Sequence, residues 1–246
     1  MSRTGIVIAM RSEAACITSQ RNLPFDQAVP IDDHLVIRMC GMGPVAARRA
    51  AIDLYDQENV AGLISFGIAG ALDDALQPGD LVSPESVQTK QSYSTDSAWR
   101  TRIERSLPAH LNVIRRPVAA SDELVSTADE KYALAARSGA CAVDMESGAI
   151  AAVASEKGVP FVVIRVISDP VQFSPPAALM DVLHPDGRVK PIALLAYLLN
   201  GSLKLGELLR FGSDAQIAFK TLKQVVQATR HELGRQVSGT CQGISD

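Results

Sequence analysis

The sequence predicts an α/β fold of three layers (αβα), in which a central mixed sheet carries helices on both faces and extra C-terminal helices follow. Short β-branched runs alternate with helical patterns up to about residue 170, a rhythm typical of a sheet with crossover helices. No linker rich in proline, glycine or serine interrupts this rhythm, which favours a single domain over residues 1–246. Beyond Asp169, prolines and then two helical patterns replace the strands. We therefore expect a core over 4–170 and a C-terminal helical extension over 171–235.

Four β-branched runs are the predicted strands, and they cover residues 4–9, 35–40, 62–66 and 161–167. The last run, FVVIRVI, is apolar at nearly every position. A strand with two apolar faces has to be covered by helices on both sides, so we place it near the centre of the sheet.

The intervening segments carry helical patterns, at 45–57, 95–107, 126–138 and 146–157. The third begins with Ser126 and Thr127 followed by acidic residues, an arrangement typical of an N-terminal cap. The fourth is rich in alanine and ends at Gly158, a residue type that often terminates helices. Two further helical patterns form the extension, the first of them unusually rich in leucine, at 190–211 and 214–234.

The composition excludes several classes of protein. Of the 246 residues, 47% are hydrophobic and 21% are charged, values of a globular chain rather than a disordered one. The 24 Lys and Arg residues do not exceed the 27 Asp and Glu residues, and the formal charge is −3, so a nucleic-acid partner is not expected. No apolar run reaches the roughly 18 residues that a membrane span needs.

The cysteines and the N-terminus indicate the cellular compartment in which the protein is expected. The four cysteines are scattered and form no CxxC, so neither a metal site nor a redox motif is expected. The first residues enter a strand without the apolar region and cleavage site of a signal peptide. These features favour a reducing cytoplasm.

Turns after the first three predicted strands hold candidate functional residues, since open α/β sheets place their sites at strand ends. Glu13 lies just after the first strand. Gly41 and Gly43 follow the second strand and precede a helix, so the backbone there can approach an anion or a sugar. Gly67 follows the third strand. Each has a simpler explanation: Glu13 could be an ordinary first-turn helix acid, and the glycines plain turns.

Two further segments, VDMES and RVISDP, place acids after apolar stretches. Glu146 lies in the first of them, and Asp169 ends the predicted central strand. Taken singly, Glu146 could be a helix acid, Met145 core filler and Asp169 a turn initiator before Pro170. Because all these elements occur together and in one order, we expect them to form a common site.

Six segments occur in one order along residues 4–170: GIVIAMRSE, CGMGPVAARRA, FGIAGAL, PGDLV, VDMESGAIAAVA and PFVVIRVISD. Together they resemble the nucleoside phosphorylase and nucleosidase superfamily, especially its methylthioadenosine/S-adenosylhomocysteine nucleosidase branch. The VDMES and RVISD pair is the most specific part of this resemblance. The C-terminal third departs from the nucleosidase pattern, which normally finishes with one helix. Its extra helices resemble a subgroup, hopanoid-associated phosphorylase, thought to act on adenosylhopane.

The resemblance implies a nucleoside phosphorylase-like fold and an enzyme that cleaves the N-glycosidic bond of a purine nucleoside, releasing adenine. On this pattern Glu146 grips the ribose hydroxyls, and Met145 packs against the sugar. Asp169 supports protonation of purine N7, and Ser168 orients it. Cleavage builds positive charge on the sugar, which a buried carboxylate stabilises, and proton donation to the base typically contributes about 10²–10⁴-fold.

The resemblance also assigns residues to the base and to the nucleophile. Leu124 and Val125, within SDELV, would flank adenine. Glu13 matches the acid that activates water in the nucleosidases. The other residues implied at the nucleophile end are Gly41, Gly43, Gly67, Arg11 and Arg48. No metal or cofactor is implied, apart from inorganic phosphate as co-substrate of a phosphorylase.

The identity of the nucleophile stays open at the level of sequence. Phosphorylases usually have a small hydroxyl residue where this chain has Ile68, and Glu13 suits activation of water. Arginines near the glycine turns would suit phosphate through bidentate contacts, although Arg48 could equally be a solvated helix residue. The subgroup resemblance favours phosphorolysis, with hydrolysis as the alternative.

The sequence also bears on two other function classes and on the partners of the protein. A non-catalytic nucleoside- or lipid-binding module would keep the pocket but would need no acid at Asp169. A dinucleotide-dependent oxidoreductase is excluded, because AMRSEA after the first strand lacks the glycines of GxGxxG. The leucine-rich segment 192–211 either packs in the protein or forms an apolar channel or membrane-facing patch for a lipid-linked nucleoside. We expect a homodimer or a larger homo-oligomer.

Overall fold

The computed structural model describes residues 3–20, 23–173, 184, 186–188, 190 and 205–234. Its strands are β1 (Arg3–Ile8), β2 (Ala28–Pro30), β3 (Leu35–Met39), β4 (Val60–Ala71), β5 (Leu81–Val82), β6 (Ser86–Gln88), β7 (Ser92–Ser94), β8 (Val113–Ile114), β9 (Val118–Ala120), β10 (Ala142–Asp144) and β11 (Phe161–Asp169). Its helices are α1 (Arg11–Ile17), α2 (Pro44–Glu58), α3 (Ser97–Arg105), α4 (Ala128–Ser138), α5 (Ser147–Lys157) and α8 (Leu205–Leu233).

The described strands form one mixed sheet whose main path runs β2-β3-β1-β4-β10-β9-β6-β7. Strand β4 is its hub, because it pairs in parallel with β1 and β11 and antiparallel with β10. Strands β5 and β8 extend the sheet beyond β11. The predicted mixed sheet is confirmed, and β11 has the predicted central place, since it is buried from Phe161 to Ser168.

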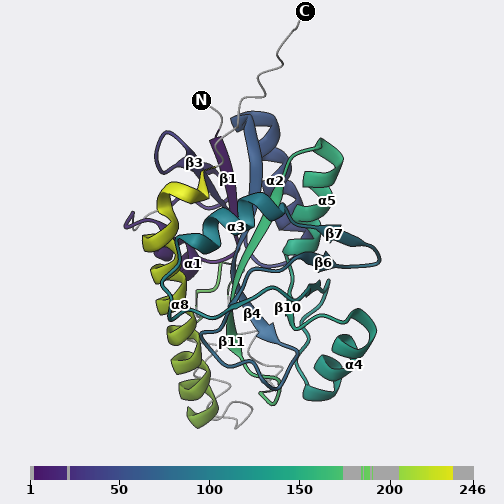
Figure 1. Cartoon of the computed structure of the whole chain (residues 1–246). Coiled ribbons are helices and arrows are strands. Elements are labelled where there is room, and N and C mark those ends of the chain that lie inside the picture. Colours follow the sequence, from purple (N-terminus) through teal and green to yellow (C-terminus); the bar gives the residue numbers. More distant parts are fainter. Residues whose placement is uncertain are drawn as a thin grey trace, which may run out of the picture.

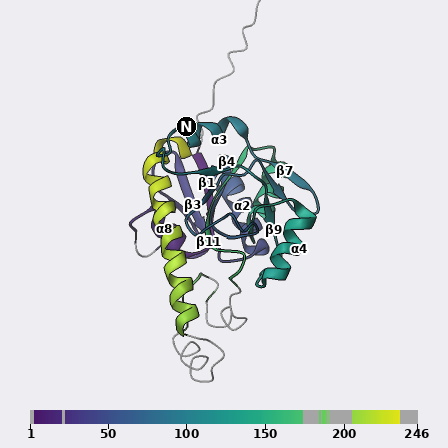
Figure 2. The same ribbon diagram turned by 60° about the horizontal axis from the view of Figure 1, so that its bottom comes forward.

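Helices cover both faces of the sheet and give the predicted three layers (Figure 1). Helices α2 and α5 lie on one face, where their buried side chains join those of β4 and β11 in one apolar cluster, with members such as Ala47, Leu54 and Ile150. Helices α1, α3 and α8 lie on the other face around a second cluster, with members such as Ile17, Trp99 and Leu222. Figure 2 shows α8 along one flank and α4 on the opposite side.

Local signals explain where several helices begin and end. The side chain of Thr127 accepts a hydrogen bond from Glu130 N, and Glu130 reaches back to the Thr127 backbone, which is the predicted cap of α4. Helices α4 and α5 end at Gly139 and Gly158, both in the left-handed conformation that glycine adopts most easily. The four predicted core helices are therefore found within a few residues of their expected limits.

The C-terminal extension differs from the prediction. We expected a helix to end at 211 and another to begin at 214, but α8 continues without a break from Leu205 to Leu233. Gly212 does not stop this helix, because the apolar face of α8 continues past it onto the sheet. The residues 191–204 of the predicted leucine-rich helix lie outside the described residues.

The short elements were missed by the sequence analysis, including α1 and the two- or three-residue strands β5 to β10. A strand of two or three residues carries too little alternation to be read from sequence. Among the described residues, no helix is long and apolar enough to cross a membrane.

Candidate active site

The C-terminal half of β4 brings the predicted site residues together. Phe66 of β4 pairs with Ile8, the last residue of β1. The segment that leads from β1 into α1, and so to Glu13, therefore begins beside Phe66. Gly70 pairs both with Val143 on β10 and with Asp169 on β11. Three chain segments that are far apart in sequence therefore end beside one strand.

Glu13 lies in the first turns of α1 and is 1% exposed. Its Oε2 accepts hydrogen bonds of 3.0 Å from the backbone N–H groups of Ala9 and Met10, and its Oε1 accepts one of 2.9 Å from Ile68 N. The glycine at position 67 is required by this arrangement, since a Cβ there would overlap Glu13 Oε1 and lie 2.6 Å from Arg165 Nη1.

Arg165 is the one described cation among three buried carboxyl groups, and we call Glu13, Asp144, Glu146 and Arg165 the Arg165 cluster. Its Nε lies 2.8 Å from Asp144 Oδ2, and its Nη2 lies 3.3 Å from Glu146 Oε2. The guanidinium also donates to Ile68 O at 3.1 Å and to Ser65 Oγ at 2.8 Å. Arg165 thereby ties β11 to β4 and to the turn before α5.

Glu146 is held at the N-terminal end of α5, where the predicted sugar-binding acid was placed. Its Oε1 accepts a hydrogen bond of 2.9 Å from Gly43 N, on the turn before α2. Gly43 has a φ of 102°, a conformation that residues other than glycine rarely adopt. Asp144 fixes the same turn, because its Oδ1 accepts from Glu146 N at 3.0 Å and from Ser147 N at 2.8 Å.

Burial and charge balance shift the titration of this cluster. Burial, reinforced by Glu146 and opposed by Arg165, raises the pKa of Glu13 to about 7. Burial also raises the pKa of Glu146, with Asp144 adding to the rise and Arg165 opposing it. For Arg165 burial acts to lower the pKa, but Asp144, Glu146 and Glu13 outweigh it, so the pKa is raised and the group stays cationic. A carboxyl that titrates near neutral pH is suited to accept a proton.

Asp169 ends β11 and has a different environment. Ser168 Oγ donates to its Oδ1 at 2.8 Å, as expected for the residue predicted to orient it. Its Oδ2 accepts from Lys131 Nζ on α4 at 2.7 Å. The side chain of Asp169 is 16% exposed and that of Lys131 is 1% exposed. Asp169 thus keeps some access to solvent while its cationic partner is buried.

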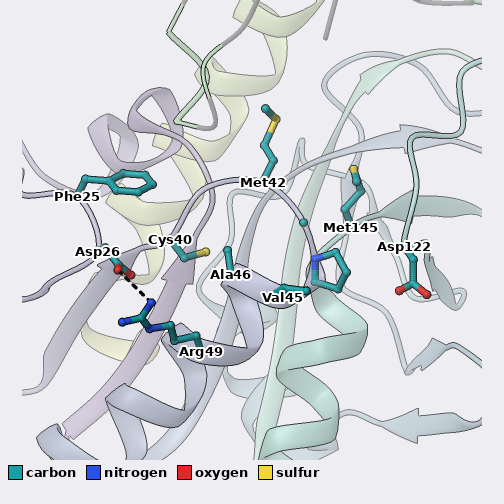
Figure 3. Close-up of a pocket in the computed structure, with 11 residues that line it drawn as sticks. Phe25, Asp26, Cys40, Met42, Val45, Ala46, Arg49, Asp122 and Met145 are labelled. Atoms are coloured by element: carbon teal, nitrogen blue, oxygen red, sulfur yellow. Dashed lines mark ion pairs between the residues drawn. The ribbon is translucent and has the colours of Figure 1, made fainter. Parts of the chain in front are cut away.

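A cavity of about 550 Å³ lies where the turn between β3 and α2 meets the turn before α5 (Figure 3). Two of its lining residues adjoin the Arg165 cluster through Glu146, since Met145 precedes Glu146 and Gly43 N donates to it. Met145 lines it, and so does Gly43, whose N–H holds Glu146. The packing of Met145 against a sugar stays a prediction. The remaining lining combines the charged residues Asp26, Arg49 and Asp122 with a larger apolar set, which is Phe25, Cys40, Met42, Pro44, Val45 and Ala46.

The residues predicted at the base lie partly elsewhere. Val125 packs against an apolar cluster that contains Leu72 and Leu134. Leu124 is 39% exposed, and neither residue is part of the cavity lining. Asp122, from the same segment, lines the cavity instead.

The two arginines predicted at the nucleophile end are engaged in ion pairs. Arg48 binds Glu156 with both Nη atoms, at 3.0 and 2.7 Å, in an exposed pair on the outer helices. Glu156 lies about 15 Å along α5 from Glu146, at 1.5 Å per residue. The structure therefore does not bring the Arg48 head group to the Arg165 cluster. Arg11 pairs with Asp186 at 2.9 Å and donates to Leu23 O at 3.2 Å.

Three buried charged residues of this region were not singled out from the sequence: Lys131, Asp144 and Arg165. Arg165 had a visible signal, since it is a charge inside an otherwise apolar strand. Asp144 precedes the MES triplet and had a weaker one. Lys131 had none, because a lysine in a helix is normally solvated. Among the described residues, His, Cys, Asp and Glu side chains form no group that could hold a metal ion.

Comparison with known proteins identifies the family. Residues 30–183 match the family model described as the phosphorylase superfamily. The chain belongs to the phosphorylase superfamily. The sequence resemblance to nucleoside phosphorylases and nucleosidases is thereby confirmed, and with it the prediction of an enzyme.

Relatives and solved structures agree with this assignment. The chain is 30% identical over 155 residues to a 5′-methylthioadenosine/S-adenosylhomocysteine nucleosidase of Baumannia cicadellinicola, covering 55% of this chain and 68% of that protein. A nucleosidase of Colwellia psychrerythraea, solved in complex with adenine, shares the fold with a TM-score of 0.71 at 19% identity, over 96% of this chain and 98% of its own. Futalosine hydrolase of Helicobacter pylori matches with a TM-score of 0.64 at 19% identity, over 92% and 97% of the two chains. The predicted three-layer fold is confirmed by these matches.

Proposed function

We propose that this protein hydrolyses the N-glycosidic bond of an adenine nucleoside that carries an apolar substituent at its 5′ position. The observation that carries the proposal is Glu13, a buried carboxyl whose pKa is raised to about 7 and which lies beside the guanidinium of Arg165. A base that titrates near the working pH can take a proton from water and still be ionised in much of the protein.

The other acids supply the remaining steps. Glu146, held by Gly43 N and Arg165, binds the ribose hydroxyls and stabilises the positive charge that develops on the sugar. Water attacks the anomeric carbon as the C–N bond breaks, and Glu13 accepts its proton. Asp169 provides a proton for N7, so that adenine departs as a neutral molecule.

Water is favoured over phosphate by the charges around Glu13. The Arg165 cluster has three carboxyl groups and one guanidinium, a balance that repels a phosphate dianion. Ile68 offers only its backbone N–H, and that donor is already bonded to Glu13. Arg48, which we expected at this end, is paired with Glu156. The names of the relatives, a nucleosidase and a hydrolase, support the same choice.

The cavity lining is apolar apart from Asp26, Arg49 and Asp122, and its apolar part supports a 5′ substituent that is not charged. It adjoins Met145 and the turn at Gly43, beside the acid assigned to the ribose. Burial of an alkyl or thioether group there would contribute about 0.8 kcal/mol per methylene. The relatives named for 5′-methylthioadenosine make a methylthio group the first substituent to test.

Phosphorolysis is the second candidate, with adenosylhopane as its substrate on the subgroup resemblance. One observation favours it: Arg11 and Arg188 share Asp186, at 2.9 and 2.7 Å, so two guanidinium groups lie together at the beginning of the helix that carries Glu13. The leucine-rich segment 192–211, predicted to take the lipid tail or to contact a membrane, lies mostly outside the described residues.

The experiment is incubation with 5′-methylthioadenosine, with and without inorganic phosphate, followed by detection of adenine and of the sugar product. Hydrolysis predicts adenine and a free sugar at a rate that does not depend on phosphate. A sugar 1-phosphate, formed only with phosphate present, would establish the second candidate. Adenosine and an adenosine with a long 5′-alkyl group should be compared in kcat/KM, because a marked preference for the long chain supports the lipid-linked substrate.

We also propose that the protein is a homodimer or a larger homo-oligomer. Phe25 and Val45 on the cavity rim are 40% and 84% exposed, and apolar side chains in such positions are often covered by a partner. Light scattering at micromolar concentration tests this, and a monomer would contradict it.

A further inference from the structure

Lys131 is a buried cation that the proposed reaction has not yet used. Its side chain is 1% exposed, and its ammonium group donates three hydrogen bonds. The acceptors are Asp169 Oδ2 at 2.7 Å, Pro170 O at 3.0 Å and Phe173 O at 3.1 Å. Taking a lysine out of water is costly, so its placement against the predicted acid calls for a physical account.

The three acceptors of Lys131 have one feature in common. All belong to the last residue of β11 or to the turn that follows it, although Lys131 itself lies on α4. The ammonium therefore fixes the direction in which β11 ends. With Ser168 bonded to Oδ1 and Lys131 bonded to Oδ2, both oxygens of Asp169 have a defined donor.

We propose that Lys131 is a positioning residue that holds Asp169 where it can pass a proton to the departing purine. The inference rests on the proposed function, because it concerns the leaving base of that reaction. As the C–N bond breaks, its electron pair moves to the base, and N7 takes a proton from Asp169. Asp169 regains a proton from solvent through its exposed edge after adenine leaves, while Lys131 stays cationic and keeps the carboxyl in place.

The experiment compares two leaving groups in Lys131→Met. The first substrate is 5′-methylthioadenosine, whose adenine needs a proton. The second is the 4-nitrophenyl riboside with the same 5′-methylthio group, whose nitrophenolate leaves without one. We expect kcat for 5′-methylthioadenosine to fall by about 10²–10⁴-fold. We expect kcat for the nitrophenyl riboside to change by less than about threefold, since its transition state does not use the acid.

Two further variants separate a role that acts through Asp169 from a general structural one. Lys157→Met removes a lysine that pairs with Asp56 at 2.8 Å on the surface, and it should leave both rates unchanged. In Asp169→Asn, adding Lys131→Met should cause little further loss on 5′-methylthioadenosine, because both changes interrupt one proton path. Thermal melting of each variant checks folding, and Lys131→Gln, which keeps a donor, replaces Lys131→Met if the latter unfolds.

Three results would contradict the inference. Equal losses on the two substrates would assign Lys131 a structural role and overturn the inference. Fully additive losses in the double variant would do the same. A parent protein that releases neither adenine nor nitrophenolate would overturn the proposed function itself, and the inference with it.

Discussion

The Arg165 cluster and the Lys131–Asp169 pair each take one member from β11, Arg165 and Asp169, which are four residues apart. The two sites differ in charge balance and in exposure. In the cluster one guanidinium serves three buried carboxyl groups. In the pair one ammonium serves one carboxyl, which is 16% exposed. Burial, reinforced by the nearby Glu146 and opposed by Arg165, raises the pKa of Glu13 to about 7.

The difference in charge balance suits the cluster and the pair to different roles in the proposed reaction. Where carboxyl groups outnumber cations, one of them can act as a base near neutral pH. In the pair, the carboxyl of Asp169 is held by its own cation and keeps some access to solvent. Both sites contain a buried cation, so loss of either cation should lower stability, and the cluster should lose more because three carboxyl groups depend on Arg165.

Arg165→Met is the strongest test of the difference between the Arg165 cluster and the Lys131–Asp169 pair. It leaves Glu13, Asp144 and Glu146 buried without their cation, and breaking a buried ion pair in this way costs about 3–5 kcal/mol. We expect the free energy of unfolding, measured with urea, to fall by that amount and activity to be lost. A variant as stable as the parent would show that the cluster does not depend on its cation.

Glu13→Gln should have the next largest effect. It removes the proposed base while keeping a similar shape, so kcat for 5′-methylthioadenosine should fall by about 10²–10⁴-fold without phosphate. Binding of adenine, measured by calorimetry, should persist because Glu13 does not contact the base in the proposed reaction. A near-normal rate would assign the nucleophile to another group and would favour phosphorolysis.

The pH dependence of kcat/KM tests the role of Glu13 within the Arg165 cluster. A base must be ionised to act, and the pKa of Glu13 is raised to about 7. We therefore expect kcat/KM to rise about tenfold per pH unit below 7 and to level off above it. The acid limb should disappear in the residual activity of Glu13→Gln. An unchanged limb in that variant would mean that another group sets it.

Arg48→Met should have the smallest effect and provides the matched control for Arg165→Met. Its ion pair with Glu156 is exposed, with side chains 44% and 51% accessible, and such pairs contribute less than about 1 kcal/mol. Activity should be unchanged, since the head group lies away from the Arg165 cluster. A clear rise in the KM for phosphate would restore the sequence-based assignment of Arg48 to the nucleophile end.

The sequence by itself determined much of the fold. Long patterned elements such as α2, α5 and β11 were predicted within a few residues, because period and capping residues are local properties. The acids Glu13, Glu146 and Asp169 were found because each follows a strand and because their order matches one superfamily. The break between two C-terminal helices was predicted wrongly, since Gly212 weakens a helix locally while packing of α8 on the sheet outweighs it.

Only the tertiary structure decided how the acids are balanced. That Arg165 serves three carboxyl groups depends on β10, β11 and α1 meeting beside β4, and no spacing in the sequence encodes these contacts. That Arg48 turns to Glu156, and Lys131 to Asp169, depends on which helix faces which strand. Residue type and local order are written along the chain, whereas charge compensation is a property of neighbours in space, and it is this compensation that sets proton affinity and therefore chemistry.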